Sequence, residues 1–266
     1  MNILFIGDIV GNPGREAIAK LLPKLKAEFH IELTVANAEN AAGGAGLTPR
    51  VADDLFRMGV DVLTTGDHIW DRREINEALL NNPLLLRPAN FPEGAPGRGW
   101  CIFKVPTGAS VAIVNLEGRV FMRYQIDCPF KTAKIILEQL QGQANIILVD
   151  IHAEATSEKM ALAHFLDGAV SAVVGTHTHI QTADEKVLPG GTAYITDLGM
   201  TGPYDSVIGQ RKEKIIERFI TGLPTRFEVA SDEVQLTGVV LDIDAKTGKA
   251  NSIQRIQRSM KPKLTE

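Results

Sequence analysis

The sequence predicts an α/β fold in which helices cover β-sheet on the outside. Two observations support this prediction. Short apolar runs, typical of buried strands, alternate along the chain with longer amphipathic stretches, typical of helices. Hydrophobic residues make up 44% of the 266 residues, which is enough for a core that needs no disulfide or structural metal. Strands that alternate with helices in this way form layered α/β proteins.

The first part of the chain repeats a strand–helix unit. The apolar run at 2–8 ends in Gly and Asp and predicts a buried strand. An amphipathic helix is expected at 15–28, where Ile18, Leu22 and Leu25 share one face. The same cycle predicts strands at 33–36 and 60–64 and helices at 49–58 and 73–80.

The later part continues the cycle after a Pro- and Gly-rich connection at 83–99. Strands at 101–105 and 110–116 are predicted to pair antiparallel around a turn. Further elements are helices at 129–140 and 157–166 and strands at 146–149, 169–174, 192–196 and 234–242. The late strands predict one mixed sheet or two sheets. No long linker divides the chain, so we predict one domain over 1–266, and leave open a small cap or insertion around 83–130.

Charge and composition disfavour several classes of protein. The net charge is −4, and no block of basic residues favours duplex nucleic acid as the main partner. The apolar runs are much shorter than the ~20 residues of a membrane span, and the N-terminus has no signal-peptide pattern. The two cysteines, Cys101 and Cys128, lie in no CxxC motif. We therefore expect a cytoplasmic protein with no membrane partner.

Ionisable residues gather where the predicted strands end. Four of the six histidines lie there, namely His68, His152, His177 and His179. A single strand-end Asp is usually a turn former, and a single His is usually a satisfied core or surface residue. The carboxyl ends of strands in an α/β sheet share one edge, however, so these residues are expected to converge.

Convergence would bring three carboxylates and three imidazoles together: Asp8, Glu39, Asp67, His152, His177 and His179. Without a cation, the like charges would repel one another and would be costly to desolvate. Mixed shells of imidazole and carboxylate suit zinc, iron and manganese. Six such ligands exceed what one tetrahedral ion needs, so the sequence predicts two transition-metal ions.

Other catalytic motifs are absent. The glycines after the first strand lack the GxGxxG spacing of a dinucleotide loop, and the chain has no GxxxxGK[ST] phosphate loop. It also has no GxSxG nucleophile elbow.

The strand-end residues resemble the motifs of calcineurin-like metallophosphoesterases, in the same order along the chain. These motifs are Gly7-Asp8, Glu39-Asn40, Gly66-Asp67-His68, His152 and Gly175-Thr-His177-Thr-His179. More narrowly, the chain is similar to the YmdB-like branch, through NAENAAGG at 37–44 and DIHAEATSEK at 150–159. The segments 175–179, 190–194 and 196–203 also match. The resemblance covers nearly the whole chain.

The resemblance implies a four-layer α/β/β/α sandwich, with two mixed sheets flanked by helices. It further implies a cytosolic bacterial enzyme that hydrolyses phosphodiesters, of the kind that act on 2′,3′-cyclic nucleotides. The expected cofactors are two ions per chain, with iron first and manganese or zinc as alternatives. The oligomeric state stays open, including a homo-oligomer.

The resemblance also implies roles for individual residues. The first metal would bind Asp8 and His179, Glu39 would bridge both metals, and the second metal would bind Asp67, His152 and His177. Asn40 would lie near the first metal, and His68 would stand beside the substrate. Beyond the motifs, Asn115 and Arg119 are candidates to orient the phosphate or its sugar, and Arg119 is equally compatible with a solvated loop charge.

Three positions depart from the superfamily pattern. Val10 stands where the D-x-H motif has its His, and Glu39 replaces an Asp. Both departures fit the YmdB-like branch. Asp67 fits neither pattern, because the usual residue is Asn. An Asp can still bind through oxygen, but it adds a negative charge to the second metal site.

The leading hypothesis is a metal-dependent phosphodiesterase in which a metal-activated hydroxide attacks phosphorus. His68 would protonate the leaving oxygen, a role worth about 10²–10⁴-fold in rate. One alternative is a metal-stabilised regulatory or scaffold protein with only residual hydrolysis. Another is a metallohydrolase for C–O or C–N bonds. The enzyme is favoured because His68 has no structural role beside a filled metal site.

Overall fold

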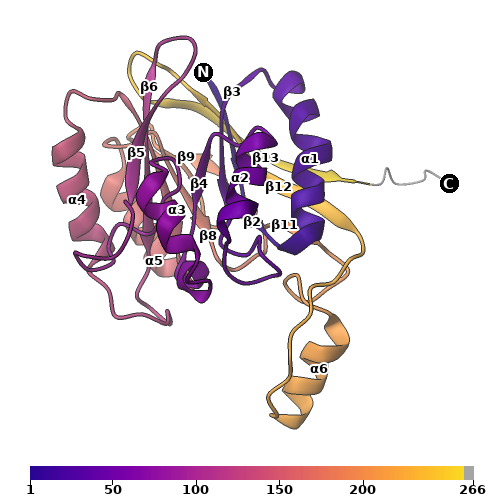
Figure 1. The fold of residues 1–266 in the computed structure, drawn as a ribbon. Coiled ribbons are helices and arrows are strands. Elements are labelled where there is room, and N and C mark those ends of the chain that lie inside the picture. The colour runs from indigo at the N-terminus through magenta and orange to yellow at the C-terminus, as the bar shows by residue number, and fades with distance from the viewer. Residues whose placement is uncertain (261–266) are drawn as a thin grey trace.

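The structure, a computed structural model, describes residues 1–260. Two β-sheets face each other, and helices cover both outer faces (Figure 1). Each sheet contains parallel and antiparallel strand pairs. The predicted α/β class is therefore confirmed, as are the two mixed sheets flanked by helices.

The first sheet has seven strands within the described residues, in the order β2-β11-β12-β1-β3-β4, with β13 also paired to β12. At its centre, β1 (Asn2–Ile6) runs parallel to β3 (Ile31–Asn37) and antiparallel to β12 (Val234–Ile243). The remaining strands are β2 (Asp8–Ile9), β4 (Val62–Thr64), β11 (Met200–Pro203) and β13 (Ala250–Ser259). Because β4 is parallel to β3, the carboxyl ends of β1, β3 and β4 lie at one edge.

The second sheet has six strands in the described part of the chain, in the order β5-β6-β7-β8-β10-β9. Its parallel strands are β6 (Ser110–Glu117), β7 (Ile146–His152), β8 (Ala172–Thr176) and β10 (Ala193–Ile195). The antiparallel edge strands are β5 (Trp100–Lys104) and β9 (Lys186–Val187). The predicted antiparallel pair is confirmed as β5 and β6, and these strands join segment 83–130 to this sheet.

Helices α1 (Gly11–Glu28), α2 (Pro49–Arg57) and α3 (Ile75–Asn81) pack on the first sheet. Helices α4 (Pro129–Leu140) and α5 (Thr156–Leu166) pack on the second sheet. The sequence also explains where α2 begins. The Thr48 hydroxyl accepts a hydrogen bond from the Val51 amide and caps the helix, and Pro49 occupies the first helical position.

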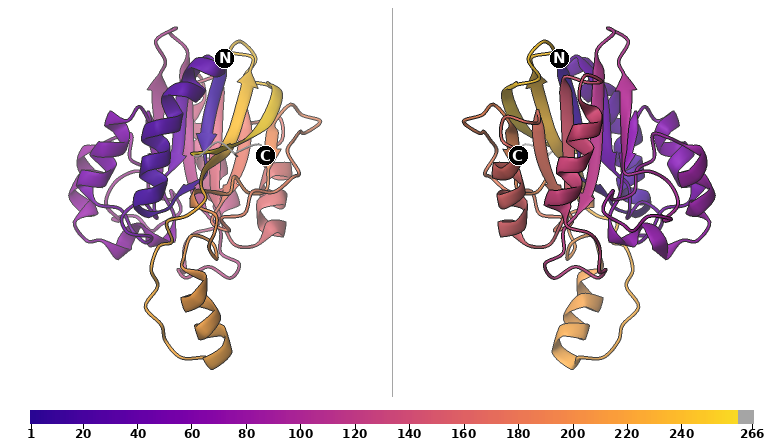
Figure 2. Two further views of the ribbon diagram at one scale, coloured as in Figure 1. Left: turned by 90° about the vertical axis from the view of Figure 1, so that its right-hand side faces the viewer. Right: turned by 90° about the vertical axis from the view of Figure 1, so that its left-hand side faces the viewer.

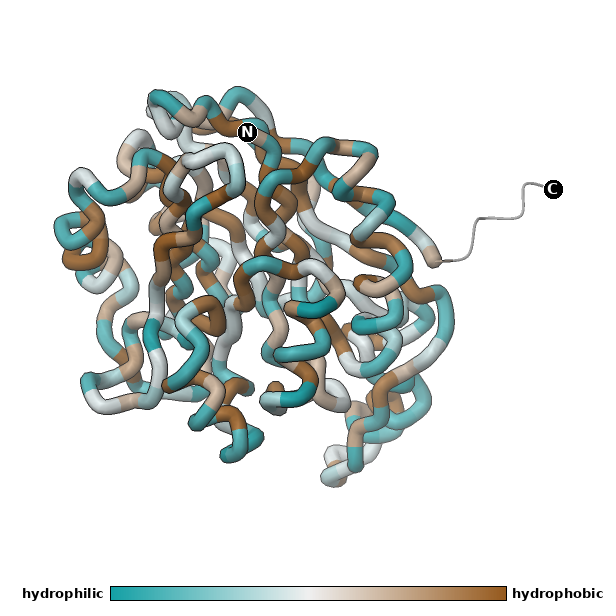
Figure 3. Tube along the Cα trace, turned by 45° about the horizontal axis from the view of Figure 1, so that its top comes forward, coloured by the Kyte–Doolittle hydropathy of each residue, from teal (hydrophilic) through white to brown (hydrophobic). Residues whose placement is uncertain are grey.

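Alternation along the strands explains the layers. In β1, Ile3 and Phe5 face the other sheet, whereas Leu4 and Ile6 face the helices. In β6, Val111 and Ile113 likewise face the first sheet, whereas Ala112 and Val114 face α4 and α5. Side chains alternate across a strand, and both faces of each sheet are buried. The strands therefore appear in the sequence as continuous apolar runs. Figure 3 shows these hydrophobic strands in the interior and mostly hydrophilic loops around them.

Several predicted boundaries differ from the structure. The strand expected at 146–149 continues to His152, and the one expected at 169–174 is β8, which ends at Thr176. These strands were predicted too short or misplaced because buried polar residues at their ends resemble loop residues. The strands β2, β9, β11 and β13 were not predicted, nor were α6 (Lys212–Thr221) and the 3₁₀ helix η1 (Asp67–Asp71).

Helix α6 lies on an arm, residues 204–233, that projects from the body between β11 and β12 (Figures 1 and 2). At its base, Val229 packs against Gly11 and Gly44. The side chain of Phe219 on α6 is 83% exposed. Within residues 1–260, no helix is long and apolar enough to cross a membrane.

Candidate metal centre

The candidate metal centre lies where parallel strands of both sheets end. Asp8 follows β1, Glu39 follows β3, and Asp67 follows β4. From the second sheet, His152 is the last residue of β7, and His177 follows β8. Ligand sites of open α/β sheets form at such carboxyl ends. The convergence predicted from the sequence is therefore confirmed for these five residues.

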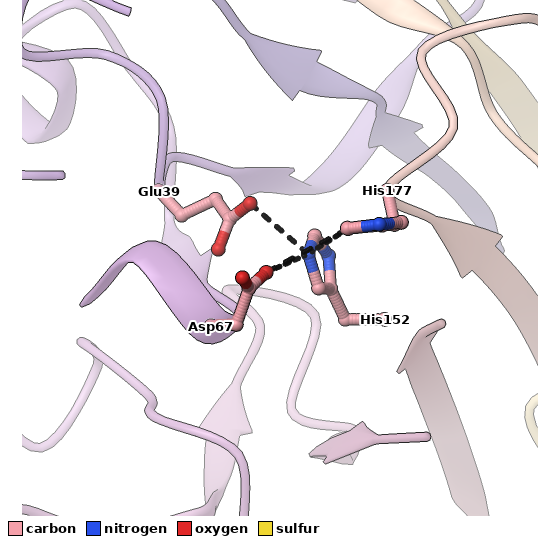
Figure 4. Close-up of side chains that lie close together, drawn as sticks. All are labelled: Glu39, Asp67, His152 and His177. Atoms are coloured by element: carbon pink, nitrogen blue, oxygen red, sulfur yellow. Dashed lines mark hydrogen bonds and ion pairs between the residues drawn. The ribbon is translucent and has the colours of Figure 1, made fainter. Parts of the chain in front are cut away.

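Four of these side chains point at one another (Figure 4). One ligand atom from each of Glu39, Asp67, His152 and His177 lies within 4.8 Å of every other. The Nε2 atom of His152 is 3.0 Å from Glu39 Oε1 and 3.4 Å from Asp67 Oδ1. It is also 3.0 Å from Nδ1 of His177. These distances describe a ready-made cation site.

The other predicted ligands border this cluster. Asp8 Oδ1 lies 3.9 Å from Nδ1 of His152 and 3.9 Å from Nε2 of His179. The Asn40 amide nitrogen donates to Glu39 Oε1 at 3.1 Å and lies 3.2 Å from Nε2 of His179. The structure thus brings all seven predicted metal ligands into one region, with Glu39 between the two groups.

The approach of these loops requires glycine at one position. A Cβ atom on Gly66, just before Asp67, would lie 2.1 Å from Cδ2 of His152. Only a residue without a side chain lets this loop pass so close to the imidazole ring.

Hydrogen bonds fix the orientation of His152. Its Nδ1 lies 2.9 Å from Thr176 Oγ1, and that hydroxyl donates to Asp150 Oδ1 at 2.8 Å. Because the hydroxyl proton is committed to Asp150, Thr176 accepts the Nδ1 proton of His152. The Nε2 atom therefore faces the cluster. In metal-binding sites, a hydrogen bond to one histidine nitrogen orients the ring so that the other nitrogen faces the metal.

The other two histidines are held in the same way. Nδ1 of His179 donates to the carbonyl of Ile208 at 2.9 Å, so Nε2 points toward Asp8. Nε2 of His177 lies 3.3 Å from the Glu154 carboxylate, so Nδ1 points into the cluster. Each imidazole thus has one nitrogen engaged outside the site and one directed into it.

Unpartnered atoms show that the residues fit a cation. Asp8 Oδ1 and Asp67 Oδ1 are buried and have no hydrogen-bond partner among the described residues. Burial raises the pKa of Asp8. Burial disfavours charge on His152, yet the surrounding carboxylates, Glu39 first, outweigh it and raise its pKa. A proton and a metal ion therefore compete for the same Nε2 atom, as expected for a metal ligand.

His177 is suited to bind a metal at neutral pH. Burial and the neighbouring charge of His152 lower the pKa of His177 to about 4. Its imidazole is then neutral, which is the form that coordinates a cation.

His68 stands at the edge of the cluster, at the second residue of η1. Its backbone amide donates to Glu39 Oε2 at 3.0 Å, while its ring is partly exposed. Nδ1 of His68 lies 2.8 Å from Asp71 Oδ2, and Arg123 donates to the other oxygen of Asp71 at 3.1 Å. Burial alone would lower the pKa of His68, but Glu39, Asp67 and Asp71 outweigh it and raise the pKa.

The two predicted substrate residues differ in their surroundings. Asn115 is fully buried, and its Oδ1 accepts a hydrogen bond from the Thr65 amide at 2.9 Å. The side chain of Arg119 is exposed, while its backbone amide is bonded to the Glu158 carboxylate. Substrate binding by either residue stays a prediction.

The loop that carries His177 and His179 has a strained backbone and is fixed by a buried ion pair. Both residues have positive φ angles, 101° for His177 and 65° for His179. The fully buried Lys159 donates to the Thr176 carbonyl at 2.7 Å and to Asp197 Oδ2 at 2.8 Å. The same oxygen of Asp197 accepts from the Thr178 amide at 3.1 Å, between the two histidines. The ion pair therefore fixes this loop.

Lys159 and Asp197 lie in the segments 150–159 and 196–203 that match the family, but no role was predicted for either. A signal for Lys159 was present, because Lys159, Leu162, Ala163 and Leu166 repeat at helical spacing, and all four are buried in α5. A lysine on the apolar face of a helix indicates a buried partner. Glu117 was also missed: burial raises its pKa to about 8, and neither carboxylate oxygen has a hydrogen-bond partner among the described residues.

We expect Lys159→Met to lower the free energy of unfolding by about 3–5 kcal/mol, because it leaves Asp197 buried without its partner. The variant should also lose metal to a chelator faster than wild type. Denaturant unfolding and timed chelation measure the two effects. The control is Lys214→Met, which breaks an exposed pair with Glu217 and should cost less than about 1 kcal/mol. Equal losses in the two variants would contradict a role for the buried pair.

Comparison with known proteins identifies the family. The YmdB-like protein family matches residues 4–256. The chain is 51% identical over 256 residues to the 2′,3′-cyclic-nucleotide 2′-phosphodiesterase of Bacillus subtilis (strain 168), covering 96% of each chain. The crystal structure of a novel phosphatase from Mycoplasma pneumoniae is 35% identical, with a TM-score of 0.91 over 97% of this chain and 93% of that chain.

A more distant structure shares the fold. The calcineurin-like phosphoesterase YfkN from Bacillus subtilis is 12% identical, with a TM-score of 0.56 over 100% of this chain and 92% of that chain. The family match spans nearly all of the sequence, and the site residues that suggested the resemblance lie together in the structure. This chain therefore belongs to the YmdB-like protein family.

Proposed function

We propose that this protein is a metal-dependent phosphodiesterase that hydrolyses 2′,3′-cyclic nucleotides. The observation that carries the proposal is the cluster of Glu39, Asp67, His152 and His177, with His68 beside it. The 51% identity to a phosphodiesterase of this substrate class supports the choice of substrate.

We assign the ligands of two ions as follows. Asp8 and His179 would hold the first ion, with Asn40 beside it. Asp67, His152 and His177 would hold the second ion, and Glu39 would serve both. The mixed oxygen and nitrogen donors suit iron, manganese and zinc, and the resemblance to the YmdB-like branch implies iron first. When bound, two such ions supply Lewis acidity and an activated water for attack on phosphorus.

Protein side chains supply proton donation, phosphate binding and shielding of the cluster from solvent. His68 is held by Asp71 through Nδ1, which leaves Nε2 free to donate a proton to the leaving oxygen. Its raised pKa keeps the ring protonated to higher pH than a free histidine. Arg119, two residues after the end of β6, has an exposed side chain and is the candidate to attract the phosphate. The second sheet shields the cluster from behind, since Asp150 and His152 are fully buried.

Two measurements test the proposal. Elemental analysis of the purified protein should find about two transition-metal ions per chain, and the loaded protein should hydrolyse 2′,3′-cyclic AMP. A stoichiometry that stays at one ion under excess iron or manganese would contradict the two-ion assignment. Full metal content without hydrolysis of any phosphodiester would instead favour a regulatory or scaffold protein.

Family membership supports two further proposals. We propose a cytoplasmic bacterial location, and one domain over 1–266 that carries the arm 204–233 as an appendage. A homo-oligomer stays open and is measured by light scattering.

Asp67 is the position where this chain departs both from the superfamily pattern and from the YmdB-like branch. Its side chain lies within the cluster, and its Oδ1 atom is buried with no hydrogen-bond partner among residues 1–260. With Asp8 and Glu39 it gives the proposed site three negative charges. Extra ligand charge holds cations more tightly but weakens their Lewis acidity.

We therefore expect Asp67→Asn to retain two ions, to lose them faster to a chelator, and to shift the rise of rate with pH toward lower pH. Timed chelation and the pH–rate profile measure these changes. A variant that held metal more tightly, or whose profile moved to higher pH, would show that the charge of Asp67 does not act in this way.

A further inference from the structure

A ten-residue loop, 118–127, connects β6 to α4 beside the metal centre. The side chain of Asn90 fastens its two ends together. Asn90 Nδ2 donates to the Glu117 carbonyl at 2.7 Å and to the Asp127 carbonyl at 3.0 Å, while Oδ1 accepts from the Glu117 amide at 2.9 Å. A surface loop with tied ends is compact, and such loops are frequently functional.

The loop is also fixed to the catalytic side of the site. The Gly118 amide donates to the carbonyl of His152 at 2.9 Å. The amides of Arg119 and Val120 donate to the Glu158 carboxylate at 3.0–3.1 Å.

Farther along the loop, Arg123 bonds Asp71, the residue that holds His68. The loop is therefore bonded to the backbone of a proposed metal ligand, His152, and to the carboxylate that holds the proposed general acid, His68. This arrangement places the loop beside the cluster.

Between these fixed points, the loop presents a free aromatic ring. Phe121 is 88% exposed and has a φ angle of 63°, a left-handed conformation that is unfavourable for a phenylalanine. A strained backbone that displays an exposed ring indicates a functional constraint rather than packing. The neighbouring aromatic residue differs, because the Tyr124 ring is already covered by Arg123 and Phe91.

Arg119 completes the pair of free groups. Its side chain makes no hydrogen bond or ion pair with the residues that the structure describes, whereas Arg123 is bonded to Asp71. Phe121 is the third residue after Gly118, so its Cα lies at most about 11 Å from that of Gly118, the residue bonded to His152. That reach is compatible with a nucleotide whose phosphate lies at the metal centre.

We propose that loop 118–127 binds the nucleoside part of the substrate, with Phe121 stacking on the base and Arg119 attracting the phosphate. The proposal rests on the function proposed above. An aromatic face stacks on any nucleobase, and a free guanidinium pairs with phosphate oxygens. The combination of a free ring and a free arginine on one anchored loop fits a nucleotide better than a simple phosphodiester.

Comparison of two substrates tests this subsite: 2′,3′-cyclic AMP and ribose 2,3-cyclic phosphate, which lacks the base. We expect Phe121→Ala to lower the ratio of their kcat/KM values by about 5- to 100-fold, the effect of losing one base stack. Phe121→Trp should keep the ratio close to that of wild type. The matched control is Phe219→Ala, which removes an equally exposed phenylalanine from the arm.

The outcomes separate the subsite from the function. If wild type hydrolyses both substrates and Phe121→Ala leaves their ratio unchanged, the subsite is wrong and the phosphodiesterase stands. If wild type hydrolyses neither substrate, the proposed function itself fails. A change in mass by light scattering in Phe121→Ala, with no change in the ratio, would show that the ring contacts a second copy of the chain and would overturn the subsite.

Discussion

Replacing Glu39 by Gln is expected to remove metal and activity together, more completely than any other single ligand change. Glu39 is the residue that we assign to both ions, and its carboxylate lies between the His152 group and Asn40. The amide of Gln cannot supply the negative charge that holds two cations. Loss of a residue that only supports a ligand already costs 10–100-fold in metal affinity or activity. We therefore expect a loss in kcat/KM of more than about 100-fold.

Elemental analysis and kinetics on the same preparation check this result. Glu28→Gln is a suitable control, because this half-exposed carboxylate pairs with Arg258 and lies outside the site. The control should retain full metal and rate. A Glu39→Gln protein with two ions and a near-normal rate would show that another residue bridges the metals.

His68→Ala is expected to give the second large effect, with the opposite metal result. His68 touches the cluster only through its backbone amide, which the substitution preserves. Both ions should therefore stay bound, while kcat falls by about 10²-fold or more from loss of the general acid. Substrates with nitrophenyl leaving groups need little protonation and should lose much less.

The dependence on the leaving group decides the role of His68. An equal loss for nitrophenyl and alkyl esters would mean that the ring only positions the substrate, and loss of metal would mean that it is a ligand. His164→Ala is the control, since His164 is exposed on α5. Because the pKa of His68 is raised, wild-type activity should also persist to higher pH than activity that depends on a free histidine.

The sequence predicted the metal cluster because parallel strands bring their carboxyl ends together regardless of how far apart they lie in the chain. Asp8, Glu39 and Asp67 follow short apolar runs, so their convergence could be inferred without coordinates. The sequence also placed His152 at this edge, although its strand was predicted too short. Buried polar residues at the end of a strand look like the start of a loop.

Other features depend on contacts that no local pattern encodes. The pair of Lys159 and Asp197 joins residues 38 positions apart, and Asp197 follows a strand of only three residues. Neither the arm nor its helix was predicted from the sequence. An amphipathic stretch is expected to pack its apolar face on a sheet, whereas the apolar face of α6 stays mostly exposed. The exposure of Phe121 likewise follows from the strained loop around it.

The origin of the ligands has a consequence for biosynthesis. The carboxylates come from the first 67 residues, whereas the last histidine is residue 179. Strand β1, which leads to Asp8, pairs with β12 (Val234–Ile243), so one side of β1 lacks its partner strand until residue 243 has been made. Chains that rely on such distant pairings fold slowly. Metal loading should therefore wait until β12 has been made and has paired with β1, and newly made chains should pass through a metal-free state.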